Sequence, residues 1–288
     1  MSKAQKQDKF LSNLIEGAKK RTKRAIQHPY RIFNINWLQE KYLKHASKGQ
    51  EYKHSYQGKK IIFTDPQAFL LSVRELFIEE IYSFKTDNPK PVIIDCGAHI
   101  GMSILFFKTL YPGASIIAFE PDTHNHSLTE TNLKNWGYQD VQLFKKAVWI
   151  NNGTIHFNQL NDMGSSIVEE DKDAGGDVVS VESVRLKDYL NNKVDFLKLD
   201  IEGAEFAVIT DSMEKLQNVE NLFIEYHGRF EEMQKLNSIL SIVVSQGFAY
   251  YIKEAGILYN KPFVDFLSRN KSDYDVQLNI FCFRINRS

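Results

Sequence analysis

A glycine-containing turn that directly follows an apolar run is the strongest chemical signal in the sequence. The turn occupies residues 95–101 and reads Asp-Cys-Gly-Ala-His-Ile-Gly. Its glycines allow the backbone to approach a ligand closely, and the N–H groups that open the following helix face the crevice beyond the strand. Glu120 ends the next apolar run, 25 residues after Asp95, where a carboxylate can accept hydrogen bonds from both hydroxyls of a ribose. The combination predicts a nucleoside-binding site.

The glycine spacing separates the possible nucleoside cofactors. Dinucleotide-binding turns read G-x-G-x-x-G, with the pyrophosphate on the helix N-terminus, whereas Gly97 and Gly101 are spaced G-x-x-x-G. Asp95 at the end of the strand would repel a pyrophosphate, but it can attract the ammonium or sulfonium group of S-adenosylmethionine, directly or through water. Two alternatives are a nicotinamide-dependent oxidoreductase, which the spacing disfavours, and a non-catalytic nucleoside-binding protein, which the complete set of acidic and glycine residues disfavours.

A second block, KLDIEGAE, gathers ionisable residues within eight positions, 198–205. Asp200 ends a predicted strand whose tip faces the same crevice as Asp95. Glu202 and Glu205 follow in a loop or first helical turn, where carboxylates also complement the helix dipole. Three carboxylates can bind a divalent cation, but no further fixed ligand accompanies them, so we predict no metal site.

Several segments together resemble the FkbM family of S-adenosylmethionine-dependent methyltransferases. The resemblance covers about residues 70–285, and KLDIEGAE is its most specific part. It implies a Rossmann-like methyltransferase fold and O-methylation of a hydroxyl group on a sugar, a polyketide or a related natural product. The segments that carry it are VIIDCGAHIGMSILFF, IIAFEPDTHNHSLTETNLKNWG, VRLKDYL and FLKLDIEGAEFAVI.

The resemblance also implies which residues hold S-adenosylmethionine. This sequence departs from the family at His99, where asparagine is common, and at the third predicted strand, which ends in Lys146-Ala147-Val148 rather than in an acidic residue. The backbone of Ala147 is therefore the expected contact to the adenine. The predicted cofactor-binding residues are Asp95, Gly97, Ala98, His99, Gly101, Glu120, Pro121, Ala147 and Asp200.

The same resemblance places the strand tip at Asp200 beside the methionine end of the cofactor and the acceptor. Asp200 and Glu202 are therefore candidate catalytic residues. His227 follows the apolar run NLFIEY, and a histidine can accept the proton of an attacking hydroxyl near neutral pH. It is therefore a rival candidate for the general base. The candidate acceptor-binding residues are Ser165, Lys198 and Glu205.

Strands and helices must alternate to position these residues. From Pro91 onward short apolar runs alternate with helical patterns, which predicts an α/β fold with a mostly parallel, doubly wound sheet. The last two runs lack a comparable helix between them, which predicts an antiparallel hairpin at the C-terminal edge. The apolar runs span 92–95, 115–120, 141–149, 195–200, 221–226, 248–253 and 277–283, and the helical patterns span 100–110, 122–136, 203–216 and 229–246.

Charge is distributed unevenly along a chain whose formal net charge is zero. Residues 1–60 carry 15 Lys and Arg against 4 Asp and Glu, and residues 2–27 have an amphipathic helical pattern. We expect a basic helical extension over 1–60, which could contact an anionic membrane surface, and a methyltransferase domain over 61–288. The aspartate-capped pattern that begins at Asp65 predicts a helix whose apolar stripe extends to Phe84 and which stops before Pro89.

Composition sets the broad class of the protein. Apolar residues make up 43% and charged residues 25% of the 288 residues, which is ordinary for a globular protein. The chain has two cysteines and no apolar run of the roughly 18 residues that span a bilayer. We therefore expect a cytoplasmic protein, with a membrane-peripheral location as the alternative. The resemblance to the FkbM family implies an enzyme that acts on a small-molecule or glycan acceptor, and we expect no nucleic-acid partner.

Overall fold

The computed structural model describes residues 28–158, 178–256, 258–265 and 274–285. The chain divides into two compact units, Met1–Ile81 and Tyr82–Ser288. The helix expected over 2–27 lies outside the described residues, and the division expected between residues 60 and 61 stays a prediction. Within the described ranges, no helix is long and apolar enough to cross a membrane.

The first unit is a small α/β assembly around stacked aromatic rings. Phe33 stacks on Tyr56 and Phe63 stacks on Phe69, each with ring centroids 4.0 Å apart. As the sequence predicts, the Asp65 side chain caps a helix by accepting hydrogen bonds from two backbone N–H groups. The elements are η1 (Pro29–Phe33), α2 (Trp37–His45), β1 (Tyr52–Tyr56), β2 (Lys59–Phe63), α3 (Pro66–Val73) and the π-helical η2 (Arg74–Ile78).

The helix expected to run from Asp65 to Phe84 is shorter than predicted. After α3 the chain continues as the π-helical turn η2, whose C-cap is Glu79. The side chain of Arg74 pairs with the carboxylate of Glu79 at 2.6 Å where the helix ends. The apolar spacing that suggested a longer helix instead belongs to a turn and an extended segment.

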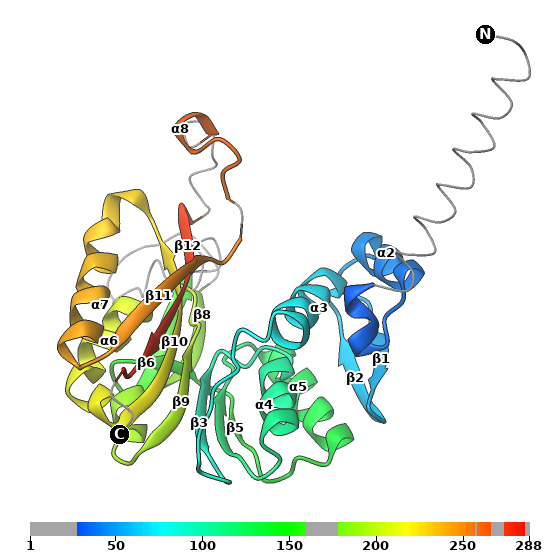
Figure 1. The fold of residues 1–288 in the computed structure, drawn as a ribbon, viewed down its shortest axis with the longest axis horizontal. Helices are drawn as coiled ribbons and strands as arrows, with labels where there is room; N and C mark the ends of the chain where they lie inside the picture. The colour runs from blue at the N-terminus through cyan, green and yellow to red at the C-terminus, as the bar shows by residue number, and fades with distance from the viewer. Residues whose placement is uncertain (1–27, 159–177, 257, 266–273, 286–288) are drawn as a thin grey trace, which may run out of the picture. The chain divides into compact units, whose positions relative to one another are not determined.

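A seven-stranded sheet organises the second unit, in the order β11-β12-β10-β9-β3-β4-β5 (Figure 1). The five strands from β10 to β5 run parallel, and β12 is antiparallel to both of its neighbours. This arrangement confirms the predicted Rossmann-like α/β sheet with an antiparallel C-terminal edge. The strands are β3 (Val92–Cys96), β4 (Ser115–Phe119), β5 (Gln142–Phe144), β9 (Val194–Leu199), β10 (Val219–Gly228), β11 (Ala249–Glu254) and β12 (Val276–Phe283).

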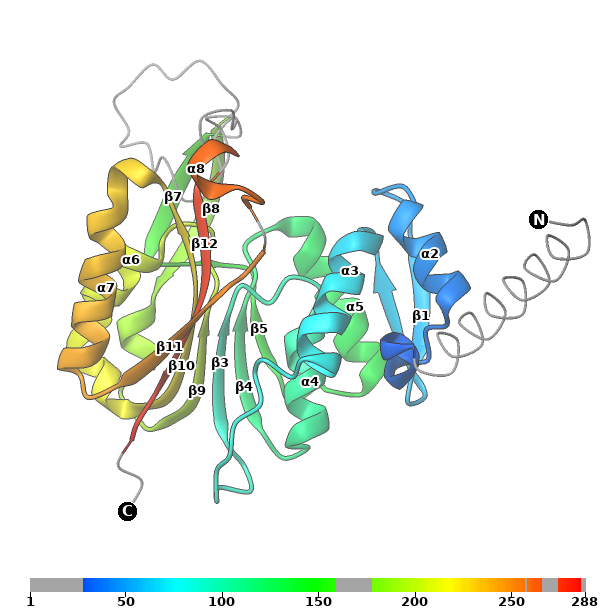
Figure 2. The same cartoon turned by 45° about the horizontal axis from the view of Figure 1, so that its top comes forward.

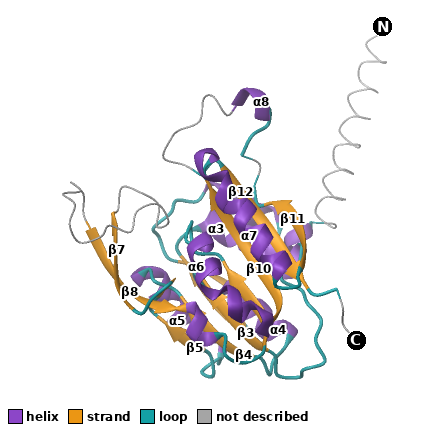
Figure 3. Cartoon of the chain, turned by 90° about the vertical axis from the view of Figure 1, so that its left-hand side faces the viewer, coloured by secondary structure: helices purple, strands orange, loops and turns teal. Residues whose placement is uncertain are grey.

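Helices cover both faces of this sheet. Figures 1 and 2 show α4 and α5 on one face and α6 and α7 on the other, and Figure 3 looks onto the face with α6 and α7. The bounds lie within a few residues of the predicted helical patterns. The helices are α4 (Met102–Leu110), α5 (Thr123–Trp136), α6 (Glu205–Ser212), α7 (Met233–Ser245) and the short α8 (Pro262–Asp265), with 3₁₀ turns η3 (Leu186–Tyr189), η4 (Met213–Asn218) and η5 (Phe230–Glu232).

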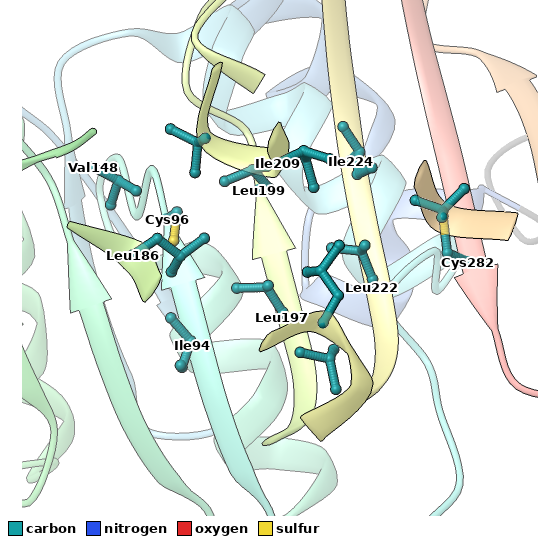
Figure 4. Close-up of a cluster of buried hydrophobic side chains, with 14 of the residues drawn as sticks. Ile94, Cys96, Val148, Leu186, Leu197, Leu199, Ile209, Leu222, Ile224 and Cys282 are labelled. Carbon is teal, nitrogen blue, oxygen red and sulfur yellow. The ribbon is translucent and has the colours of Figure 1, made fainter. Parts of the chain in front are cut away.

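Side chains alternate between the two faces of the central strands, so the apolar core and the charged residues Asp95 and Lys198 lie on opposite faces of the sheet. Alternate residues of β3, β9 and β10 join one buried apolar cluster with residues of α6 and α7 (Figure 4). Because side chains point to opposite faces at successive positions, Asp95 and Lys198 lie on the other face, which α4 covers. The strand residues in the cluster include Ile94, Cys96, Leu197, Leu199, Leu222 and Ile224.

The predicted third strand over 141–149 is wrong as one element. Its first part is β5, and its second part, β6 (Ala147–Trp149), joins a separate three-stranded sheet with β8 (Val178–Arg185) and β7 (Gly153–Asn158). Lys146 pairs with Glu182 of β8 at 3.1 Å, and β6 then runs parallel to β8. Lys145 and Lys146 interrupt the run, and the hydrogen-bonding partner of the chain changes between Phe144 and Ala147.

The antiparallel pairing of β11 and β12 confirms the predicted C-terminal edge, with a different connection. The two strands pair along residues 249–254 and 278–283. They are linked by residues 255–275, which include α8, rather than by a tight turn. The long connection also allows β12 to insert between β10 and β11.

Candidate active site

The glycine turn after β3 packs directly against the tip of β9. Gly97 has a left-handed backbone with φ of +93°, and a Cβ added there would lie 2.0 Å from the backbone oxygen of Asp200. The N–H groups of Gly97 and Ala98 both donate to the backbone oxygen of Phe119, at 3.0 and 2.9 Å. Only glycine permits this approach, so the turn joins the ends of β3, β4 and β9.

Asp95 lies at the centre of this junction. Its side chain is fully buried, Ser103 of α4 donates a hydrogen bond to its Oδ2 at 2.5 Å, and Lys198 Nζ lies 3.4 Å from its Oδ1. Among the described residues, Oδ1 has no hydrogen-bond partner. The predicted carboxylate is therefore present at the strand end, with one buried oxygen that keeps hydrogen-bonding capacity.

Lys198 links the two acidic strand ends. Its Nζ lies 3.1 Å from Asp200 Oδ2 and donates to the backbone oxygen of Gly97 at 2.7 Å. Burial by itself would lower the pKa of Lys198, but the carboxylates of Asp200 and Asp95 raise it well above its usual value. The side chain is therefore a permanent buried cation that holds the turn and the β9 tip together. Its predicted acceptor-binding role stays a prediction.

Glu120 lies directly after β4, with its side chain turned toward the glycine turn. Its Oε2 accepts a hydrogen bond from the His99 N–H at 2.7 Å, and its Oε1 accepts one from the Asp122 N–H at 3.0 Å. Burial raises the pKa of Glu120 to about 7, although these two N–H groups favour its charged form. Each carboxylate oxygen has a second lone pair, so Glu120 can still accept a hydrogen bond from a ligand.

The remaining predicted cofactor residues occupy different surroundings. His99 has a left-handed backbone with φ of 49°, and its carbonyl oxygen accepts a hydrogen bond from the Thr129 hydroxyl. Gly101, with φ of 84°, is the N-cap of α4. Pro121 is partly exposed beside Glu120. Ala147 was expected at the end of a strand of the large sheet. It is instead the first residue of β6, which belongs to the three-stranded sheet.

A buried histidine and several carboxylates meet at the end of β10. His227 Nδ1 lies 3.3 Å from Glu205 Oε1, and its Nε2 lies 3.7 Å from oxygens of both Glu202 and Glu225. One potential ligand atom from each of Asp200, Glu202 and His227 lies within 4.8 Å of the others. The structure thus brings together the three residues that the sequence proposed as catalytic.

Glu205 shapes the loop that carries Glu202. It is fully buried at the first position of α6, and its Oε1 accepts hydrogen bonds from the N–H groups of Gly203 and Ile201 at 3.0 and 3.3 Å. Its Oε2 has no partner among the described residues. Glu202 has φ of 54° and Gly203 has φ of 96°, so two successive left-handed residues turn the chain here. These contacts give Glu205 a role in shaping the loop, and its predicted contact with the acceptor stays a prediction.

The protonation state of His227 determines whether it can act as a base. Burial by itself would lower its pKa, but the carboxylates of Glu205, Glu202 and Asp200 raise the pKa of His227 to about 10. The imidazole therefore carries a proton at neutral pH and must lose it before it can serve as a base. The carboxylates near the imidazole include those of Asp200, Glu202 and Glu225.

The structure adds two residues that the sequence analysis missed. Ser103 holds Asp95 from the second residue of α4, and a serine after the glycine turn could have suggested this role. Tyr274 donates to the backbone oxygen of Glu202 at 2.7 Å, and its ring centroid lies 5.0 Å from that of His227. No sequence signal linked it to a loop 72 positions away. Ser165, predicted to contact the acceptor, lies outside the described residues.

Comparison with known proteins identifies a family over most of this site. Residues 95–250, slightly more than half of the chain, match the family described as the methyltransferase FkbM domain. The matched range begins at Asp95 and includes both the glycine turn and the residues around His227.

Two curated relatives are named as methyltransferases. The chain is 28% identical to methyltransferase sdnD of Sordaria araneosa over 187 residues, which cover 53% of this chain and 72% of that protein. It is also 28% identical to 2-O-methyltransferase NoeI of Sinorhizobium fredii over 184 residues, which cover 55% of this chain and 73% of that protein.

Solved structures show weaker similarity. Methyltransferase FkbM from Methylobacillus flagellatus KT matches with a TM-score of 0.46 and 16% identity, over 73% of this chain and 47% of that chain. A methyltransferase from Agrobacterium tumefaciens matches with a TM-score of 0.47 and 9% identity, over 84% of this chain and 72% of that one.

Proposed function

The chain belongs to the FkbM methyltransferase family, and we propose that it transfers a methyl group from S-adenosylmethionine to a hydroxyl oxygen of its acceptor. The observation that carries this proposal is the junction of β3, β4 and β9, where Asp95, Glu120 and Asp200 end three neighbouring parallel strands. Family membership favours methyl transfer over a nicotinamide-dependent oxidoreductase and over a non-catalytic nucleoside-binding protein.

The residues at this junction suit a cationic nucleoside. The three carboxylates outnumber the single ammonium of Lys198, so the field favours a positively charged sulfonium over a pyrophosphate. Glu120 would hold the ribose hydroxyls, and the Gly97–Gly101 turn would lie against the nucleoside. Asp95 is fully buried, so it would act on the donor through its charge and its hold on the turn. When bound, S-adenosylmethionine supplies an electrophilic methyl group on a positively charged sulfur.

The chemistry assigned to this chain is alignment and proton removal. With the donor bound, the site would hold an acceptor oxygen in line with the methyl carbon, the electron pair of the broken carbon–sulfur bond would remain on sulfur, and a carboxylate of this chain would accept the hydroxyl proton. Holding nucleophile and methyl group in line can supply roughly 7–11 kcal/mol of the rate enhancement. We propose Asp200 or Glu202 as the group that accepts the proton, because the neighbouring carboxylates raise the pKa of His227 to about 10 and favour its protonated form.

We propose a sugar or glycan hydroxyl, or that of a related natural product, as the acceptor. The relative named as a 2-O-methyltransferase supports oxygen as the nucleophilic atom. Both cysteines are free and buried, which suits a reducing compartment and supports action in the cytoplasm. Contact of the basic segment 1–27 with an anionic membrane is part of the same proposal, because a glycan acceptor on a lipid carrier would be presented at that surface.

Two measurements test the function. The full chain should be stabilised against heat by S-adenosylhomocysteine, as a ligand that binds only the native state requires. Glycans from cells that produce the protein should be heavier by one methylene unit than glycans from cells that lack it. Cells producing Asp200→Asn should lack this mass difference although the variant folds. Methylated glycans in the Asp200→Asn cells would reject the assigned acceptor side, and absence of any stabilisation by the ligand would reject the cofactor.

A further inference from the structure

We propose that Asp200, Glu202 and His227 bind a divalent transition-metal ion, such as Mn²⁺, at the ends of β9 and β10. One ligand atom from each of the three residues lies within 4.8 Å of the others. Ligands that share an ion at a distance of about 2.1 Å lie about 3.0–4.2 Å from one another. The limit of 4.8 Å is close to this range, so the three atoms lie near the spacing that one shared ion requires.

His227 is the best-defined ligand of the three. Its side chain is only 3% exposed, and within the described ranges its Nε2 makes no hydrogen bond. That nitrogen instead points between oxygens of Glu202 and Glu225, each 3.7 Å away. This separation is too long for a hydrogen bond, but it falls within the range for two ligands of one ion.

The opposite side of the imidazole is also arranged as at a metal centre. His227 Nδ1 faces the fully buried carboxylate of Glu205 at 3.3 Å. Metal-bound histidines commonly donate their second ring N–H to a carboxylate, which fixes the orientation of the ring and makes the ligand nitrogen more basic. Glu205 is itself fixed by the N–H groups of Gly203 and Ile201, so the ring orientation is set by the fold.

The local negative charge favours binding of a cation, and the local exposure to solvent allows that cation to exchange. Asp200, Glu202 and Glu225 contribute three carboxylates to the site, and Lys198 contacts one of them at Asp200 Oδ2. The Glu202 side chain is half exposed, which gives an ion a route into the site. The mixed nitrogen and oxygen ligands suit Mn²⁺ or another first-row transition-metal ion better than Mg²⁺ or Ca²⁺, which prefer oxygen ligands alone.

The consequence for catalysis rests on the proposed methyl transfer. A bound divalent cation can coordinate the acceptor hydroxyl and lower its pKa, so that the proton leaves to water and the oxygen attacks the methyl group. Asp200, Glu202 and His227 would then act as ligands, and the ion would displace the proton that the imidazole of His227 carries in the metal-free protein. The substrate class is an acceptor with a hydroxyl next to a second oxygen, as a sugar ring presents, because two adjacent oxygens can share the ion.

The binding test needs neither methyl donor nor acceptor. The full chain is stripped with a chelator and titrated with Mn²⁺, and free Mn²⁺ is measured by its electron paramagnetic resonance signal. We expect one bound ion per chain, and at least tenfold weaker binding in His227→Gln and in Glu202→Gln. The matched controls are His156→Gln and Glu182→Gln, which lie in the three-stranded sheet, and they should bind Mn²⁺ like the wild type.

The outcomes separate this site from the proposed function. No Mn²⁺ binding by the wild type, or wild-type affinity in a folded Glu202→Gln variant, overturns the metal site. Glu202 serves for this purpose because its half-exposed side chain can change without loss of the core. Mn²⁺ binding that depends on Glu202 and His227, without methyl transfer to any glycan, would leave the metal site standing and reject the function. Methyl transfer that continues unchanged in the chelator-stripped protein would show that the ion has no role in catalysis.

Discussion

Asp95 and Lys198 are direct partners on the neighbouring parallel strands β3 and β9, and their charged atoms lie 3.4 Å apart beneath the glycine turn. Both side chains are buried, so their attraction is screened little by solvent. Lys198 also contacts Asp200 and the backbone oxygen of Gly97. The ammonium therefore stabilises the geometry of the whole strand junction.

Replacing Lys198 with methionine should destabilise the protein strongly. The substitution keeps most of the length of the side chain but leaves two carboxylates near each other without a cation, and breaking a buried pair in this way costs about 3–5 kcal/mol. Urea unfolding measures the change in the free energy of unfolding. Lys187→Met is the control, because its pair with Glu214 is solvent-exposed on the carboxylate side and should contribute about 0–1 kcal/mol. Recovery of stability on adding Asp95→Asn would assign the loss to charge.

Gly97→Ala should destabilise the protein by more than the cost of placing alanine in a left-handed backbone conformation. The new Cβ would lie 2.0 Å from the Asp200 carbonyl oxygen, so the β3 turn and the β9 tip must separate. Gly137→Ala is matched in φ but meets nothing within 4 Å, and it should cost only about 1–2 kcal/mol. Thermal melts with and without S-adenosylhomocysteine compare the two variants. Equal melting temperatures and equal ligand-induced shifts would contradict the predicted contact.

Glu120 should make stability fall as pH rises through the weakly acidic range. Its pKa is raised to about 7 in the folded protein from an ordinary value of 4.5, so between these values the folded state holds a proton that the unfolded state has lost. Stability then decreases with increasing pH. Glu120→Gln removes the titrating carboxyl group, so the stability of the variant should not fall in this way. Between pH 5 and pH 7 its free energy of unfolding should rise relative to that of the wild type by up to about 2–3 kcal/mol. Parallel curves for the two proteins would show that the carboxyl titrates normally.

Glu120 should also contribute to cofactor binding. Losing two ribose hydrogen bonds costs about 1–3 kcal/mol, so Glu120→Ala should weaken S-adenosylhomocysteine binding by that amount in a calorimetric titration. Asp122→Ala is a neighbouring control, because its side chain caps α5 and has no assigned contact with the ribose. Unchanged affinity in Glu120→Ala would remove Glu120 from the cofactor site.

Deleting residues 1–27 should separate membrane association from cofactor binding. The deletion leaves every proposed cofactor contact intact, so the affinity for S-adenosylhomocysteine should not change. Co-sedimentation of the full chain with anionic vesicles should weaken at high salt, because the Debye length falls from about 8 Å at physiological ionic strength to about 3 Å at 1 M. Absence of pelleting at low salt would reject the membrane contact, and loss of cofactor binding on deletion would place the segment within the catalytic domain.

Much of the sheet was predictable because its signals are local. The apolar runs of β3, β4, β9 and β10 are short and bounded by turn residues, and strands of that kind are recognisable without knowledge of their partners. The break between β5 and β6 was not predictable in this way. Both halves have strand-forming residues, and Lys145 and Lys146 between them do not reveal that Ala147 pairs with Ser183 in a second sheet.

The sequence by itself determined the family, the order of strands and helices, and the residues at the strand ends. Glycine spacing and the positions of Asp95, Glu120 and Asp200 are properties of the chain, and they suffice because strand ends in a parallel sheet meet at one edge. Only the tertiary structure decided the charge states and contacts. Lys198 is a buried cation because two carboxylates from different segments face it, and His227 is protonated because Glu205 and Glu202 surround it. Such effects depend on distances and burial, which packing sets and sequence spacing does not encode.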